Sequence, residues 1–85
     1  MDKSRSIAIL DPSSEAGMMY LSAAIAIGTS CIAAAIALQS VVSAGFAAAV
    51  ERPEMRSFMI IMAGLAEGIA IYGLLIAILI LTTAR

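Results

Sequence analysis

The chain has 85 residues, of which 62% are hydrophobic and 13% charged, and its mean hydropathy is +1.05. Soluble domains average about 45–50% apolar and about 25% charged residues, so the composition predicts an integral membrane protein. A net charge of −1 gives no basic surface for nucleic acid. With no histidine and a single cysteine, Cys31, which we interpret as a small hydrophobe, we expect no metal or other cofactor.

Residues 1–16 form a polar N-terminal lead. Their apolar stretch, residues 7–10, is too short for the core of a signal peptide, so we expect the N-terminus to be retained. A turn is predicted at residues 11–14, where Ser13 or Ser14 would cap the helix that follows. A partly disordered surface tail is the alternative.

Residues 17–51 are predicted to form the first transmembrane helix. No charged residue occurs between positions 17 and 50. A helix of that length measures about 51 Å, against about 30 Å of hydrocarbon, so it should tilt or protrude. Alanine, serine and glycine crowd it, and small residues let membrane helices approach closely. We interpret it as a packing helix surrounded by other helices. An alanine-rich span without a fixed partner is the alternative.

Residues 52–55 form a polar loop, and residues 56–85 are the predicted second transmembrane helix. Pro53 ends the first helix, and so short a connection makes the two helices antiparallel neighbours. The second half of the second helix, residues 74–81, is bulky and aliphatic, as contact with lipid prefers. The predicted fold is therefore an all-α membrane protein, a two-helix antiparallel transmembrane hairpin.

One carboxylate, Glu67, lies inside the second apolar run, where a charge costs at least about 2.5–3.5 kcal/mol. Gln39 lies fourteen residues before Pro53 and Glu67 fourteen after it, so the hairpin should place both at similar depth. Tyr72 lies about 140° further around the helix, where a neighbouring helix could let it reach the same site. A carboxyl group here is neutral when protonated and needs a cation when ionised. It suits a switchable carrier of H⁺ or Na⁺. No nucleophile–base pair occurs, so no enzymatic activity of its own is expected.

Two stretches resemble a known family, the c-type proteolipid subunits of rotary ATPases, and most closely its V/A-type branch. They are the loop Glu51-Arg-Pro-Glu54 and the run Met62-Ala-Gly … Ile69-Ala-Ile-Tyr-Gly-Leu74, within a resemblance that covers about residues 17–81. The family implies a homo-oligomeric ring of identical subunits in the cell membrane, in contact with lipid. The ring turns against a stator membrane subunit that carries an essential arginine, and it couples ion flow to ATP synthesis or hydrolysis.

By this resemblance, Glu67 matches the ion-carrying carboxylate, Gln39 matches the first-helix glutamine found in several rings, and Tyr72 matches the tyrosine that hydrogen-bonds the carboxylate. Leu65 matches the position whose backbone carbonyl binds sodium. The polar loop would face the cytoplasm and contact the central-stalk subunits, with both termini on the opposite side of the membrane. The residues expected to contact the stalk are Glu51, Arg52, Pro53 and Glu54.

The chain departs from the family pattern in two ways. Its first helix uses alanine and serine where many rings have a dense glycine repeat, which predicts wider helix spacing. Gly68 and Ile69 follow the carboxylate where several sodium rings have a hydroxyl residue, although Ser40 or Ser43 could replace that hydroxyl. The missing ligand favours H⁺ over Na⁺.

Three alternatives to a proton-carrying ring stay open at this point. The same ring could carry Na⁺ through Glu67, Gln39, Tyr72 and the Leu65 carbonyl. The chain could instead be a small structural or pore-forming hairpin, in which Glu67 is dispensable or lines an open pore. It could also be an accessory subunit of a larger membrane enzyme, in which Glu67 pairs with a basic residue.

Overall fold

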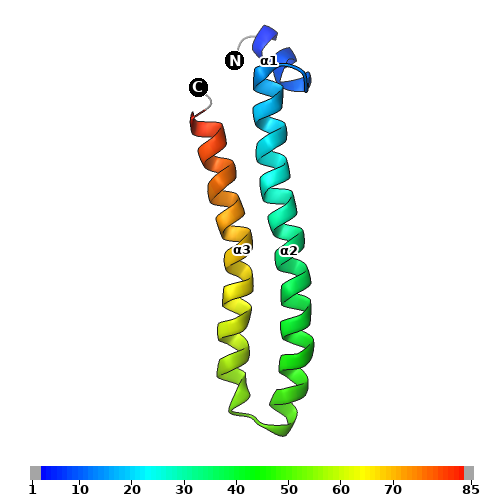
Figure 1. Cartoon of the computed structure of the whole chain (residues 1–85), viewed down its shortest axis with the longest axis vertical. Helices are drawn as coiled ribbons and strands as arrows, with labels where there is room; N and C mark the ends of the chain where they lie inside the picture. Colours follow the sequence, from blue (N-terminus) through cyan, green and yellow to red (C-terminus); the bar gives the residue numbers. More distant parts are fainter. Residues whose placement is uncertain (1–2, 84–85) are drawn as a thin grey trace.

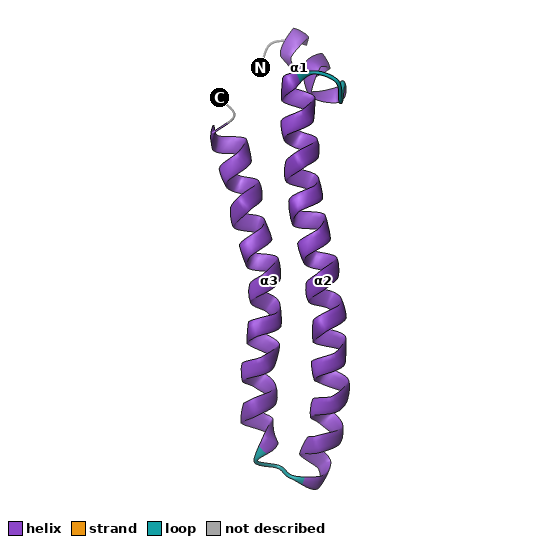
Figure 2. Cartoon of the chain, in the orientation of Figure 1, coloured by secondary structure: helices purple, strands orange, loops and turns teal. Residues whose placement is uncertain are grey.

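The computed structural model describes residues 3–83, which form three helices: α1 (Lys3–Leu10), α2 (Glu15–Glu51) and α3 (Met55–Thr83) (Figure 1). The outermost ends of the predicted segments, residues 1–2 and 84–85, lie outside the described residues. Only two short connections interrupt the helical ribbon (Figure 2). The molecule measures 61 × 18 × 16 Å, as expected of two long helices side by side.

The turn between α1 and α2 is held by hydrogen bonds around Ser14. The Ser14 hydroxyl accepts a hydrogen bond from the Gly17 N–H at 2.9 Å and donates one to the Asp11 carbonyl at 2.7 Å. Ser14 has extended backbone angles, as an N-cap residue does, so it is the one of the two predicted candidates that caps α2. The Asp11 carbonyl lies so close to Gly17 that a side chain there would overlap it. The sequence had not predicted α1 as a helix.

The loop between α2 and α3 reverses the chain within a few residues. Arg52 ends α2 in an extended conformation, and its N–H donates to the Ala48 carbonyl at 2.8 Å. Pro53 enforces this conformation, because the residue before a proline is pushed out of the helical region. The Arg52 carbonyl then accepts a hydrogen bond from the Met55 N–H at 2.9 Å, at the start of α3. The antiparallel hairpin predicted from the sequence is confirmed.

Small residues line the seam between α2 and α3. The buried residues of this seam are Ala23, Ala34, Ala66, Gly73 and Ala77. The helices approach closely where Gly73 of α3 meets α2, since a Cβ on Gly73 would overlap the Ser30 side chain and lie 3.1 Å from the Ala26 carbonyl oxygen. Close helix approach over glycine and alanine is typical of membrane packing.

The hairpin has no core of large side chains among its described residues, and most of its apolar surface is exposed. Both α2 and α3 are long and apolar enough to cross a membrane. Only 11% and 17% of their most apolar windows are buried inside the hairpin, which is unlike the core helices of a soluble protein. Lipid or other protein chains must therefore cover this surface.

Candidate functional site

Glu67 lies near the middle of α3, one residue after the buried Ala66 of the seam. Successive residues are about 100° apart around a helix, so the Glu67 side chain points to one side of the seam and is exposed. Among the described residues it has no hydrogen-bond or ion-pair partner. The single hairpin thus presents this carboxylate to its surroundings.

Two close contacts define the register of the helices: Gly73 faces Ser30, and Gly45 faces Met59, whose Cβ would lie 3.1 Å from an added Gly45 Cβ. Counting six residues back from Gly73 and six forward from Ser30 places Glu67 level with position 36. Counting from the other contact places it level with position 37. Gln39 lies two or three residues nearer the loop, about 3–4.5 Å along the axis. The two polar groups therefore lie within one helical turn of the same depth.

Gln39 nevertheless faces away from Glu67 within one hairpin. It is two residues, or about 200° of rotation, from both Ala37 and Val41, which are partly covered at the seam. Its side chain is exposed on the far side of α2. No hydrogen bond joins Gln39 to Glu67 in the part of the chain that the structure describes.

Tyr72 and Leu65 lie on the side of α3 opposite Glu67, and both side chains are 65% exposed. They are seven residues apart and so nearly in line along the helix, while each is about 140–160° from Glu67. We define two exposed flanks of α3 accordingly. The Glu67 flank comprises Ile60, Glu67, Ile71 and Leu74, and the Tyr72 flank comprises Phe58, Leu65, Ile69 and Tyr72.

This arrangement keeps the carboxylate and the phenol apart in one copy and suits their meeting between copies. In a head-to-tail ring, one flank of each copy contacts the opposite flank of the next. The carboxyl group of Glu67 would then face the phenol of Tyr72 on the neighbouring copy. A phenol can donate a hydrogen bond to a carboxylate or accept one from a carboxylic acid.

The residues of the loop between α2 and α3 are all exposed. Glu51, Arg52, Pro53 and Glu54 form the tip of the hairpin, with charges of both signs. Arg56, in the first turn of α3, is exposed beside them. This tip offers a polar docking surface about 18–21 Å along the axis from Glu67.

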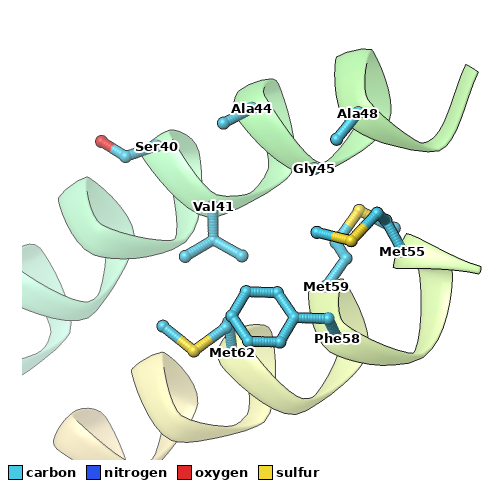
Figure 3. Close-up of a pocket in the computed structure, with 9 residues that line it drawn as sticks. All are labelled: Ser40, Val41, Ala44, Gly45, Ala48, Met55, Phe58, Met59 and Met62. Atoms are coloured by element: carbon cyan, nitrogen blue, oxygen red, sulfur yellow. The ribbon is translucent and has the colours of Figure 1, made fainter. Parts of the chain in front are cut away.

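Sequence reasoning missed an apolar groove near the loop, with a volume of about 360 Å³ (Figure 3). Its signal was present in the spacing of Met55, Met59 and Met62, which repeats every three or four residues and so follows one face of α3. The close approach of Ser30 to Gly73 was also missed, because nothing in the sequence pairs those two positions.

A protein-family model for the ATP synthase C-subunit matches residues 21–80. The chain belongs to this family. The match contains α2 from Leu21 onward, the loop, Glu67 and α3 up to Ile80. No curated protein and no solved structure matches the chain significantly.

Membership in the ATP synthase C-subunit family decides between a rotor ring and the other membrane proteins that the sequence left open. The family consists of non-catalytic membrane proteolipids that form the oligomeric rotor ring of ATP synthases. The chain is therefore a ring-forming, ion-transporting membrane protein, rather than an isolated pore or an accessory subunit. The ring also accounts for the large exposed apolar surface of the single hairpin.

Proposed function

We propose that this chain belongs to a V/A-type rotor ring, in which Glu67 carries H⁺ across the membrane and couples its flow to ATP synthesis or hydrolysis. The observation that carries the proposal is the exposed Glu67, the only carboxylate on α3 and far from both ends of that helix. The V/A-type assignment rests on the loop Glu51-Arg-Pro-Glu54 and the run around Tyr72.

The carboxyl group works because its charge can be removed. Protonated Glu67 is neutral and can pass through lipid as the ring turns, whereas the ionised form is costly there. We propose that an arginine of the stator subunit stabilises the ionised form and so releases the proton. A potential of 100 mV supplies about 2.3 kcal/mol per charge, so several protons are needed for each ATP. A ring of identical copies provides them.

The site is proposed to form between two copies. Glu67 of one copy would face Tyr72 of the next, since the two residues occupy opposite flanks of α3. The phenol would hold the carboxyl group in place while it is protonated. Gln39 lies on the far face of α2, so it takes part only if another copy brings that face against the Glu67 flank.

The choice of ion follows from the oxygen atoms near the carboxylate. Gly68 and Ile69, which come directly after Glu67, supply no side-chain oxygen, and a proton needs only the carboxyl group itself. One observation favours the Na⁺ alternative: Tyr72 lies on the flank opposite Glu67, so a phenol oxygen would face Glu67 of the next copy. The Leu65 carbonyl would have to bind the ion in addition to its helical hydrogen bond.

The orientation in the membrane is part of the same proposal. The charged, exposed tip Glu51, Arg52, Pro53 and Glu54 would lie in the cytoplasm and contact the central-stalk subunits. Both termini would then lie on the opposite side, since α1 and the described end of α3 are at the other end of the hairpin (Figure 1).

The test is to treat membranes containing the complex with dicyclohexylcarbodiimide, map the adduct, and repeat the reaction with Na⁺ at fixed pH. We expect selective labelling of Glu67 over Glu51 and Glu54, loss of ATP-coupled proton flux, and no protection by Na⁺. Protection by Na⁺ would establish the sodium alternative. A Glu67→Gln variant that keeps full ATP-coupled proton flux would overturn the proposal. Glu54→Gln is the control for labelling, because Glu67 should still be labelled in that variant.

A further inference from the structure

The apolar groove near the loop lies between α2 and α3 on the Tyr72 flank (Figure 3). Val41, Ala44 and Ala48 line it from α2, and Met55, Phe58 and Met62 line it from α3. The α2 wall is low because two of its side chains are single methyl groups. Phe58, which is 55% exposed, stands at the α3 edge. The groove thus has room for a large apolar side chain.

A second hollow lies on the other flank; it overlaps the groove in depth and extends to the loop, where Pro53 and Arg56 also line it. It is bordered by Phe46 and Val50 of α2 and by Ile60 of α3. Met59 borders both hollows, so they lie back to back across the seam. Phe46 and Ile60 are 61% and 66% exposed, which makes them prominent apolar side chains on this flank near the loop.

Ring symmetry relates the two flanks. A closed ring places neighbouring copies by rotation alone, with no shift along the ring axis. If the hairpins stand roughly along that axis, residues of one copy meet residues of equal depth in the next. The groove on the Tyr72 flank therefore faces the Phe46 region on the Glu67 flank of its neighbour.

We propose that Phe46 of each copy fills the groove of the next copy, packing over Ala44 and Ala48 and against Phe58. The partner is a second copy of this chain, and the inference rests on the ring of the proposed function. A large aromatic side chain entering a site lined by alanines and methionines buries apolar area on both copies. The contact lies on the loop side of Glu67, so it would hold neighbouring copies together without touching the ion site.

The test uses pairs of cysteines in the full complex, with Cys31→Ala as background. Phe46→Cys is combined with Ala44→Cys, which lies two residues away and on the other side of the same helix, so the pair cannot close within one copy. Disulfide formation needs Cβ atoms about 4 Å apart. The matched control combines Phe46→Cys with Ala33→Cys, on the same stripe of α2 as Ala44 and about 16.5 Å deeper.

We expect mild oxidation to convert the Phe46→Cys, Ala44→Cys ring into a ladder of covalent multimers, while the control pair and each single variant stay monomeric on denaturing gels. The inference is overturned if the ring assembles and is labelled at Glu67, but the Phe46→Cys, Ala44→Cys pair gives no ladder or gives the same ladder as the control pair. The proposed function would stand in that case. Labelling of the groove of the unmodified ring by a photoactivatable phospholipid in vesicles would show that lipid fills it, and would also overturn the inference. Absence of both ring and Glu67 labelling would instead reject the proposed function.

Discussion

At the scale of single residues, Gly73 allows α2 and α3 to pack closely because it has no side chain. A methyl group at this position would overlap the Ser30 side chain and lie 3.1 Å from the Ala26 carbonyl oxygen, which is backbone and cannot swing away. At Gly45 an added methyl group would meet mainly the flexible end of Met59. The two glycines therefore differ in the cost of replacement, although both lie at the seam.

We predict that Gly73→Ala destabilises the hairpin by about 1–3 kcal/mol, as overpacking typically does, and that Gly45→Ala costs less because methionine adapts its shape. The measurement is the temperature at which the detergent-solubilised ring releases monomers. Adding Ser30→Gly to Gly73→Ala should recover part of the loss, since it removes the overlap with the side chain and leaves the contact with the Ala26 carbonyl. Equal effects of the two glycine variants would contradict the close approach at Gly73.

The Asp11 carboxylate accepts hydrogen bonds from the Ser13 hydroxyl at 2.7 Å and from the Ser13 backbone N–H at 3.0 Å. These bonds hold the pKa of Asp11 below its ordinary value of 3.8, because they favour the ionised form. The folded-state pKa is the lower one. The stabilisation is therefore complete above the unfolded-state pKa and is lost as the pH falls through the folded-state value.

We predict that a carbon-13 NMR titration of the Asp11 carboxyl group has its midpoint below 3.8. Ser13→Ala removes the hydroxyl donor and keeps the backbone donor, so the midpoint should move upward toward the ordinary value. Ser22→Ala is the control, since this exposed serine lies on α2, outside the turn. An unchanged midpoint in Ser13→Ala would show that the hydroxyl bond is not formed in solution.

At the scale of elements, the start of α2 depends on one hydroxyl group. Ser14→Ala removes the acceptor for the Gly17 N–H, and loss of such a cap typically costs about 1 kcal/mol. We predict faster amide exchange in the first turn of α2, with the rest of the helix unchanged. Ser14→Asp restores an acceptor and should restore protection. Exchange that stays slow in Ser14→Ala would mean that contacts of α1 hold this turn.

The two long helices could be predicted because each carries an apolar run long enough to cross a membrane, with Pro53 and its charged neighbours between them. The helix α1 could not, because eight residues are too few to be helical without tertiary contacts, and those contacts come from α2. A local sequence pattern therefore predicts a helix whose own residues favour it, and not a short helix that depends on contacts with another element.

The depth of Gln39 and Glu67 along the hairpin could be predicted from the sequence, but the direction of their side chains around the helices could not. Counting from Pro53 places Gln39 and Glu67 at one level, because the rise per residue is constant. The direction of Gln39 depends on which stripe of α2 faces α3. Alanine occurs all around α2, so its sequence does not mark that stripe. The contacts of Ser30 and Gly45 with α3 were needed to define it.

At the scale of the whole molecule, the two flanks of α3 make a prediction about neighbouring copies. The described ends of the hairpin lie on one side (Figure 1), so two copies can be joined into a tandem chain. In a ring of such tandem chains, first and second halves alternate. With Glu67→Gln in the first half only, each remaining Glu67 belongs to a second half and faces Tyr72 of a first half. Tyr72→Phe placed in the first half should then change the remaining site, and the same change in the second half should not.

The measurement is the rate at which dicyclohexylcarbodiimide labels the remaining Glu67, as a function of pH. Loss of one hydrogen bond is worth about 0.5–1.5 kcal/mol, or roughly a 2- to 12-fold change in rate at a given pH. Equal effects of Tyr72→Phe in the two halves would show that the phenol acts within its own copy or not at all.

The helix α3 passes Glu67 without a break, from Met55 to Thr83, and no residue described in the chain has a left-handed backbone conformation. The backbone around the carboxylate is therefore fully occupied by its own helical hydrogen bonds. If Glu67 carries the ion as proposed, we expect its loading and release to need side-chain rotation and not a change of backbone, and such rotation takes picoseconds to nanoseconds at exposed sites. The speed of each step is expected to be limited by the arrival of water and protons at Glu67 and by rotation of the ring, and not by unwinding of the helix.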